Sequence, residues 1–314
     1  MAGAAAECGE MEPVPETVID YPIHTRTLAN GLRVVVSPDH SVPVTAVNLW
    51  YDVGSRDERP GQRGWAHLFE HLMFSGSDHV ASGEHLNALQ AVGGMVNATT
   101  WFDRTNYFET VPVGALELAL WMEADRLASL PDHLSEASLD TQREVVKEEK
   151  RQRYDNVPYG DAMASLVELT FGEDHPYGHT TIGSMADLDA ATAEGAAAFF
   201  RNHYRPDNAV LTLVGDVSAK EGFRKAERAF GWIPAWNPRV RPPSVPLPPL
   251  SGVPTRELSG RVPAAAVYFA WRLPARDTPE FNACDLALSA LGGGQSSRLH
   301  QNLVRGDEVA AAAV

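Results

Sequence analysis

The sequence predicts an α+β fold in which helices flank a largely antiparallel sheet, forming a two-layer domain. Segments with alternating apolar residues, typical of strands, and segments with apolar residues three or four apart, typical of helices, occur along the same chain. These two kinds of segment do not alternate strictly, which argues against a doubly wound parallel sheet. With 314 residues, 44% of them hydrophobic, the chain can form two domains with ordinary cores.

Composition divides the chain into four parts. Residues 1–20 are small, acidic and proline-containing, which predicts a disordered tail. Residues 21–232 contain most of the predicted helices and strands and form the main domain. Eight prolines between positions 233 and 254 predict an extended linker, because proline fits neither a helix interior nor a central strand. Residues 255–314 are short for a domain, and we interpret them as the start of a truncated second one.

Hydrophobic periodicity and turn residues predict the elements of the first half. They are strands over 31–36 and 44–53, a helix containing His67, a helix over 83–92 stopped by Gly93 and Gly94, and a strand pair over 95–100 and 105–111. The second half is predicted to contain helices over 116–130, 135–154 and 190–203, a strand over 209–214 and, beyond the linker, a strand over 265–272 and a helix over 280–291. Pro131 is expected to end the first of these helices.

Charge and cysteine content exclude several functions. A net charge of -15 argues against binding nucleic acid or an anionic membrane. The two cysteines, Cys8 and Cys284, are too few for a cysteine-ligated metal site or a disulfide framework. The first residues lack the basic and apolar regions of a signal peptide, and no apolar run is long enough to span a membrane. We therefore expect a cytoplasmic protein.

The most informative segment is residues 64–74, which places two histidines and a glutamate in an otherwise apolar run. On a helix, His67 and His71 lie on one side with Glu70 beside them. Burying these groups costs on the order of a few kcal/mol unless they are paired or coordinated. A single buried histidine is more often a hydrogen-bonded core residue. A pair spaced four residues apart with an intervening acid favours a metal site.

The third ligand of a zinc site is expected to be a carboxylate, because catalytic zinc usually takes three protein ligands. The segment 142–149 offers two neighbouring candidates. Glu149 follows Val145 and Val146 by four and three residues, so it shares their apolar face, whereas Glu148 follows Glu144 and points toward solvent. Helical phase therefore favours Glu149 and leaves Glu148 as the alternative. An ordinary solvated charged face is the simpler explanation of this segment.

Together these motifs resemble the pitrilysin family of zinc peptidases, which includes insulin-degrading enzyme and the mitochondrial processing peptidase. The resemblance rests on His67-Leu68-Phe69-Glu70-His71 and on Val145-Val146-Lys147-Glu148-Glu149. It extends to further segments along the chain, at 54–58, 93–107, 158–160, 204–208, 215–216 and 292–299. It implies a metallohydrolase fold followed by a truncated copy of it, with the second domain of the inactive type.

The resemblance implies a zinc metalloendopeptidase that cleaves extended peptides or unfolded segments. His67, His71 and Glu149 would hold one Zn²⁺ per chain, and Glu70 would be the general base that activates water. Asn97 and Ala98 would present an edge strand to the peptide. Arg305 matches an arginine that binds substrate in the family, whereas Ala312 stands where the family has a tyrosine.

A different class of function remains open from the same residues. The chain could be a non-catalytic family subunit or scaffold that needs or assists a partner, because the second domain is short and lacks that tyrosine. The expected partners are a peptide substrate and either a partner subunit or a second copy of the chain that completes the substrate chamber. A zinc hydrolase that acts on something other than peptides is a further alternative.

Overall fold

A computed structural model describes residues 21–235 and 245–314 of the chain. The predicted tail, residues 1–20, and residues 236–244 of the predicted linker lie outside the described residues. The chain divides into two compact units, each described by itself below. Unit 1 comprises Met1–Gln152 and His179–Val245, and unit 2 comprises Arg153–Gly178 and Pro246–Val314. In the described residues, no helix is long and apolar enough to cross a membrane.

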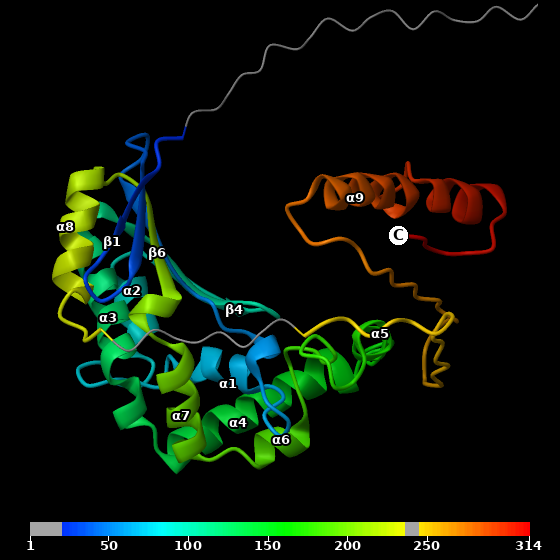
Figure 1. Ribbon diagram of the computed structural model, residues 1–314, viewed down its shortest axis with the longest axis horizontal. Coiled ribbons are helices and arrows are strands. Elements are labelled where there is room, and N and C mark those ends of the chain that lie inside the picture. Colours follow the sequence, from blue (N-terminus) through cyan, green and yellow to red (C-terminus); the bar gives the residue numbers. More distant parts are fainter. Residues whose placement is uncertain (1–20, 236–244) are drawn as a thin grey trace, which may run out of the picture. The chain divides into compact units, whose positions relative to one another are not determined.

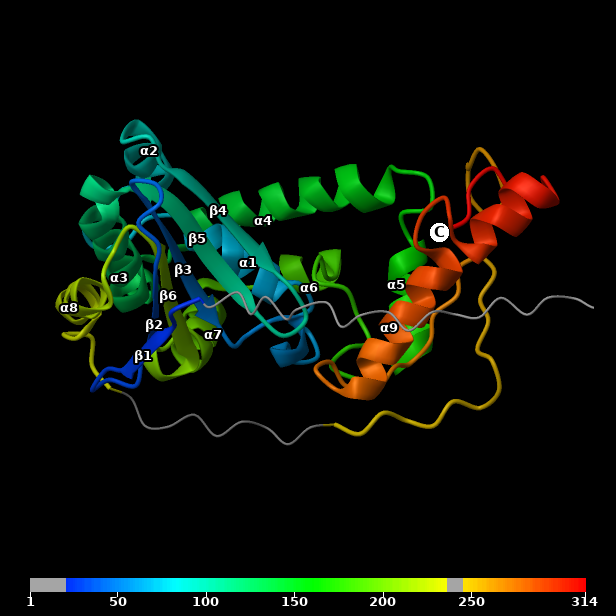
Figure 2. The same cartoon turned by 90° about the horizontal axis from the view of Figure 1, so that it is seen from above.

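Unit 1 is built on a six-stranded sheet with the order β1-β2-β6-β3-β5-β4, which can be followed across Figure 2. The strands are β1 (His24–Thr27), β2 (Arg33–Pro38), β3 (Val44–Tyr51), β4 (Met95–Thr100), β5 (Thr105–Pro112) and β6 (Ala209–Gly215). Neighbouring strands pair antiparallel except β2 and β6, which are parallel. The predicted α+β class with a largely antiparallel sheet is confirmed.

Helices pack against this sheet, as Figure 1 shows. Those of unit 1 are α1 (Trp65–Leu72), α2 (Glu84–Ala91), α3 (Leu116–His133), α4 (Glu136–Lys150), α6 (Met185–Asp189), α7 (Ala193–His203) and α8 (Ala219–Phe230). Helix α3 contacts β3 and β5, α8 contacts β2, and α1 and α2 contact β4. Along β3 and β6, alternate residues are buried, which is the pattern of a sheet with one face covered by helices.

An aromatic cluster occupies the core between α1, α7 and the sheet. Phe69 stacks on Phe199 with ring centroids 5.1 Å apart and lies 5.6 Å from the ring of Tyr204. Tyr204 in turn lies 4.8 Å from the ring of Tyr51 on β3. Offset and tilted ring pairs of this kind add to the stabilisation from burial alone. The cluster fixes the buried side of α1, so its opposite side is presented in one orientation.

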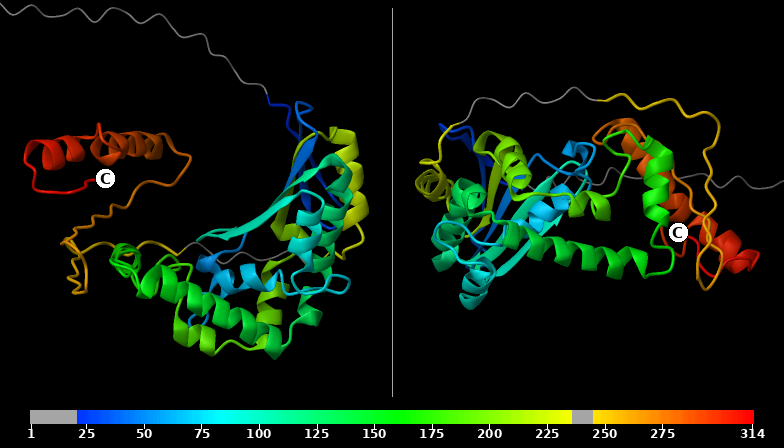
Figure 3. Two further views of the ribbon diagram at one scale, coloured as in Figure 1. Left: turned by 180° about the vertical axis from the view of Figure 1, so that it is seen from behind. Right: turned by 90° about the horizontal axis from the view of Figure 1, so that it is seen from below.

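Unit 2 contains the helices α5 (Ala162–Phe171) and α9 (Pro279–Gly292) and a π-helical segment, His300–Gly306, all visible in Figure 3. Its pieces are joined by polar contacts: the Arg256 guanidinium forms an ion pair with Glu168, and Arg272 Nε donates to the carbonyl of Thr170 at 2.7 Å. The strand predicted over 265–272 is wrong: this segment forms no strand, because no neighbouring strand pairs with it in the described part of the chain.

Four other sequence expectations need correction. Helix α3 continues through Pro131 and ends at His133, since a proline in the last turn removes only one hydrogen bond. Helix α4 ends at Lys150 and is followed by a π-helical segment, Arg151–Asp155, instead of continuing to position 154. Val145 is 45% exposed while Val146 is fully buried, so the two valines do not share one face. The expected helix over 190–203 forms only from Ala193.

Truncation of two adjacent residues of β6 should lower the stability by different amounts. Leu213 is fully buried and Val214 is 41% exposed. We expect Leu213→Ala to lower the free energy of unfolding by about 2–5 kcal/mol, because it leaves a cavity under the helices. Val214→Ala should lower it by less than about 1 kcal/mol. Urea unfolding of the two variants measures this difference, and equal losses would contradict the assigned face of the sheet.

Candidate metal centre

Helix α1 begins at a glycine that no other residue could replace easily. Gly64 has a left-handed backbone with φ of 101°. A Cβ atom there would lie 3.0 Å from the carbonyl oxygen of Ile182 and 3.2 Å from Cα of Gly183. Both the backbone conformation and the close approach of the 182–183 segment therefore require glycine. This turn directs the chain into the helix that carries both histidines.

The amino end of α1 is capped by a carboxylate from the preceding loop. Glu58 accepts hydrogen bonds from the N–H groups of Gly64 and Ala66, at 2.9 and 2.8 Å. His179 Nε2 lies 2.8 Å from the same carboxylate. Burial raises the pKa of Glu58, while the bonds from His179 and from the two N–H groups act in the opposite direction. These contacts satisfy helix N–H groups that would otherwise lack partners and fix where α1 starts.

The two histidines lie on the same side of α1. Their rings are nearly perpendicular, with centroids 4.9 Å apart, and their Nε2 atoms are 3.4 Å apart. The side chains of Leu68, Phe69 and Leu72, on the remaining sides of the helix, are buried. An amphipathic helix of one apolar side and one histidine side thus results from the spacing in the sequence.

Glu149 completes a triad with these histidines. It comes from α4, which packs against α1. Its Oε2 atom lies 3.5 Å from Nε2 of His67 and 3.4 Å from Nε2 of His71. The three side chains are 12%, 24% and 19% exposed for His67, His71 and Glu149, so the site is reachable from solvent. We call His67, His71 and Glu149 the α1 site.

The donor set of the α1 site fits zinc. Two imidazoles and one carboxylate are a common set of three protein ligands in catalytic zinc sites. Zinc–ligand bonds of about 2.0–2.1 Å in tetrahedral geometry place the donor atoms about 3.4 Å from one another, which is the spacing found here. The rival ligand Glu148 is 53% exposed and bonds instead to Arg151 and Gln152, at 3.1 and 2.8 Å. The structure thus brings Glu149, and not Glu148, to the histidines.

Glu70 lies next to His71 in the sequence but is not part of the triad. Its Oε2 atom accepts a hydrogen bond from the hydroxyl of Thr100 at 2.6 Å. Thr100 is the last residue of β4, so this bond connects the carboxylate to the edge of the sheet. A carboxylate held beside a metal site without binding the ion is suited to act as a base.

Strand β4 lies at one edge of the sheet. Asn97 is exposed, whereas the side chain of Ala98 is buried at 7% exposure. The N–H of Ala98 donates to Oδ1 of Asn97 at 2.8 Å. At Ala98, therefore, only main-chain atoms are available to a ligand. Arg305 lies in the π-helical segment of unit 2, and the structure does not relate it to the α1 site.

Sequence reasoning missed the residues that support this site. Glu58 lies in the segment 54–58, for which no role was predicted, although a glutamate shortly before a helix is a recognisable capping signal. No role was predicted for Thr100 either. No signal in the sequence pointed to His179, because its partner Glu58 is 121 residues away.

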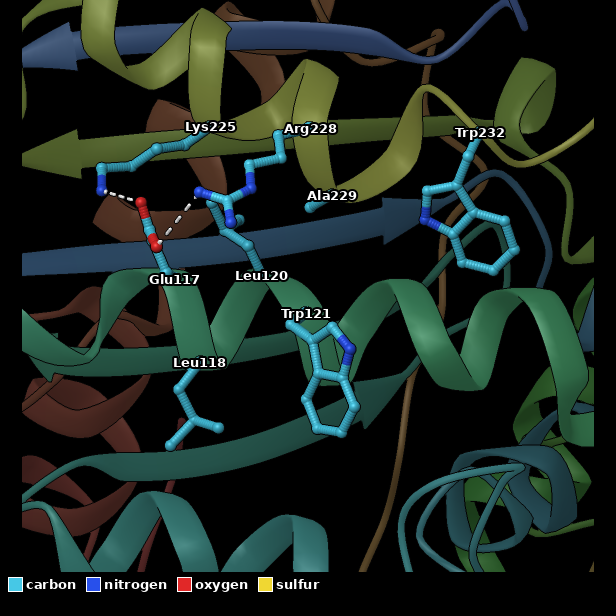
Figure 4. Close-up of a pocket in the computed structure, with 8 residues that line it drawn as sticks. All are labelled: Glu117, Leu118, Leu120, Trp121, Lys225, Arg228, Ala229 and Trp232. Carbon is cyan, nitrogen blue, oxygen red and sulfur yellow. Dashed lines mark hydrogen bonds and ion pairs between the residues drawn. The ribbon is translucent and has the colours of Figure 1, made fainter.

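A surface groove between α3 and α8 lies apart from the α1 site and contains none of its residues. Its floor and walls come from Glu117, Leu118, Leu120, Trp121, Lys225, Arg228, Ala229 and Trp232. Figure 4 shows the Glu117 carboxylate between Lys225 and Arg228, at 2.7 and 3.8 Å. The cations there are thus turned toward a carboxylate of the same chain, and the groove holds no cluster of metal ligands.

Comparison with known proteins places the chain in a family. Two sequence profiles match it: one described as Insulinase (Peptidase family M16) over residues 33–183, and one described as Peptidase M16 inactive domain over residues 190–312. Zinc protease PqqE of Helicobacter pylori is 33% identical over 281 residues, or 88% of this chain and 63% of that protein. An uncharacterised zinc protease of Streptomyces coelicolor is 32% identical, covering 90% of this chain and 61% of that protein.

Solved structures agree with this placement. The crystal structure of a protease from Helicobacter pylori matches with a TM-score of 0.78 at 29% identity, covering 93% of this chain and 70% of that chain. Pitrilysin matches with a TM-score of 0.63 at 22% identity, covering 75% of this chain and 26% of that chain, which shows a shared fold. The chain spans less than two thirds of the length of the two curated relatives named above. By its sequence profiles and its relatives, the chain belongs to peptidase family M16, the pitrilysin or insulinase family.

Proposed function

We propose that this chain is a zinc metalloendopeptidase that hydrolyses peptide bonds within extended or unfolded polypeptide segments. The observation that carries the proposal is the α1 site, which gathers three zinc-type donors beside Glu70 and the free edge of β4. The names of the relatives, which are zinc proteases, support a peptidase role. Those relatives are longer than this chain, so their peptidase activity is proposed for this chain by similarity.

The ligands of the ion would be His67, His71 and Glu149. When bound, a zinc ion supplies Lewis acidity, which lowers the pKa of water and polarises a peptide carbonyl. The side chains of α1 and α4 orient these donors, because the opposite side of α1 is locked in the aromatic core. The partial exposure of the three donors leaves the site open to a substrate.

Glu70 would move the proton in this reaction. Its carboxylate accepts a hydrogen bond from Thr100 at 2.6 Å, which restrains its orientation. In that position it can take a proton from the attacking water and deliver it to the leaving amine.

The peptide would bind by adding a strand to β4. Main-chain hydrogen bonds at a sheet edge satisfy a peptide irrespective of its side chains, which suits broad specificity. Asn97 and the main chain of Ala98 are the contacts we assign to this edge. Arg305 is a further proposed substrate contact. A partner subunit or a second copy of the chain would complete the chamber around the peptide.

A non-catalytic family subunit is the second candidate. The match of residues 190–312 to the profile described as an inactive domain favours it, as does Ala312 at the position of the family tyrosine. The two candidates differ in turnover. Full chain loaded with zinc and mixed with an internally quenched, unstructured peptide should cleave it faster than the Glu70→Gln variant does. No cleavage above background by the unmodified chain would favour the non-catalytic subunit.

Alanine substitution of Glu149 and of its neighbour Glu148 tests which of the two is the third zinc ligand. Glu149→Ala should remove about one equivalent of zinc per chain and weaken zinc binding by about 100-fold or more, because a direct ligand is lost. Glu148→Ala is the matched control, since it lies next in the sequence but is 53% exposed. It should leave the zinc content unchanged. Mass spectrometry of the metal in purified chains measures both, and the reverse result would make Glu148 the ligand.

Substitution of Glu70 should separate catalysis from metal binding. Glu70→Gln keeps the size of the side chain but cannot accept a proton, so kcat should fall by about 100- to 10,000-fold. The zinc content should equal that of the unmodified chain, because Glu70 is not a ligand. Peptide cleavage that survives the substitution at the original rate would refute the assigned base.

A further inference from the structure

A second set of metal-ligand side chains lies in the core of unit 1, apart from the α1 site. His85 comes from α2, Glu109 from β5 and Glu123 from α3. Their side chains are 4%, 0% and 0% exposed. The Nε2 atom of His85 lies 3.5 Å from Oε1 of Glu109 and 3.5 Å from Oε1 of Glu123. The donor atoms of three separate elements thus converge in the interior.

The spacing of these donors is that of ligands sharing an ion. Directly hydrogen-bonded histidine–carboxylate pairs in the described chain are closer: 2.7 Å for His79 with Asp125 and 2.8 Å for His179 with Glu58. In the α1 site the corresponding distances are 3.4 and 3.5 Å. Ligands bound at about 2.0–2.2 Å to one tetrahedral ion are about 3.4 Å apart. The buried cluster matches the α1 site and not the hydrogen-bonded pairs.

The carboxylate of Glu109 is an independent indication that this cluster binds an ion. Both of its carboxylate oxygens are buried and neither has a hydrogen-bond partner. Nε2 of His85, which faces them, also lacks one. Glu123 differs, because the guanidinium of Arg126 binds it through both Nε, at 3.0 Å, and Nη2. The charge of Glu123 is therefore neutralised by Arg126, while the carboxylate of Glu109 has no hydrogen-bond donor.

We propose that His85, Glu109 and Glu123 bind a second divalent transition-metal ion of the zinc type. One imidazole and two carboxylates suit zinc or manganese, and the two free oxygens of Glu109 allow it to bind through both. Because the donors are fully enclosed, the ion has a structural role: it ties α2 and α3 to β5. Catalytic sites, by contrast, keep a position open to solvent.

A single proton on Glu109 is the rival explanation. Burial and the neighbouring Glu123 raise the pKa of Glu109, so a neutral carboxyl group would also balance the charges of Glu123 and Arg126. Such a proton would be shared between Glu109 and Glu123. It would leave Nε2 of His85, which lies 3.5 Å from an oxygen of each glutamate, without a hydrogen-bond partner, whereas an ion would engage all three side chains.

The surroundings accept the added charge. With an ion bound, the two carboxylates and Arg126 would leave one net positive charge. The Arg126 guanidinium lies over the rings of Tyr107 and Phe74, with its Cζ at 4.3 and 5.1 Å from their centroids, and ring faces stabilise a cation. Burial lowers the pKa of His85, which favours the neutral ring that coordination requires. The phenol of Tyr51 also interacts with both glutamates, and burial together with their charges raises its pKa.

The ion would stiffen the strand to which we assign peptide binding. Glu109 pairs with Val96 on β4, directly beside Asn97. Helix α2, which carries His85, precedes β4 and contacts it. Fixing α2 and β5 to α3 therefore restrains β4 from both sides. This effect is independent of whether the α1 site turns over peptide.

Metal content in a chain without the α1 site tests the proposal. The full-length His67→Ala/His71→Ala variant, refolded with Zn²⁺ and freed of excess metal by gel filtration, should retain about one equivalent of zinc. Adding Glu109→Gln, which keeps the side-chain size, should reduce this to below about 0.2 equivalents. Adding Glu194→Gln, an exposed glutamate on α7, is the matched control and should leave the content unchanged. Retention of zinc in the Glu109→Gln chain would overturn the proposal.

A cobalt measurement keeps the test decisive if Glu109→Gln does not fold. The His67→Ala/His71→Ala chain refolded with Co²⁺ should show the visible absorption of cobalt bound by four protein donor atoms, because both free oxygens of Glu109 can bind. Absence of this band, together with less than about 0.1 equivalents of bound metal, would establish the single proton on Glu109 instead.

Discussion

The contact between α1 and α4 is the constraint on which the site depends. Helix α1 can present its histidines in one direction only because Leu68, Phe69 and Leu72 are buried. Helix α4 supplies Glu149 at 3.4–3.5 Å from both imidazoles. A rotation of either helix by one residue would move a donor atom by several ångströms, since successive side chains point about 100° apart. The packing of α1 and α4 in the core therefore also determines the positions of the metal ligands.

Two buried carboxylates of unit 1, Glu58 and Glu123, are bonded by donor groups of other residues. Glu58 is bonded by the amino end of α1 and by His179 from the segment before α6. Glu123 is bonded by Arg126, three residues further along α3, and lies 3.5 Å from Nε2 of His85 on α2. An unanswered charge in such a core is strongly destabilising. The Glu58 contacts thus connect the loop before α1 to the segment before α6, and the Glu123 contacts connect α3 to α2.

Much of the fold and site could be predicted because the signals are local. The spacing of His67 and His71 is fixed by helical geometry, and β4 was predicted with its observed bounds, Met95–Thr100. Helix α8 was missed, although Phe223, Ala226 and Phe230 repeat at helical spacing among its charged residues. The strand expected over 265–272 does not form, because an alternating sequence is not sufficient: the main-chain groups of a strand need a neighbouring strand for hydrogen bonding. Likewise, nothing local links His85 to Glu109 and Glu123.

The hydrogen bond between Asn97 and the N–H of Ala98 has a thermodynamic consequence for the sheet edge. An incoming strand must displace the Asn97 amide before it can use that N–H, so this position exchanges one hydrogen bond for another and contributes little net affinity. Selection among chains at this edge then depends on how many of the remaining main-chain groups a segment can satisfy at once. A satisfied amide also makes the edge a poor template for unwanted pairing with other chains.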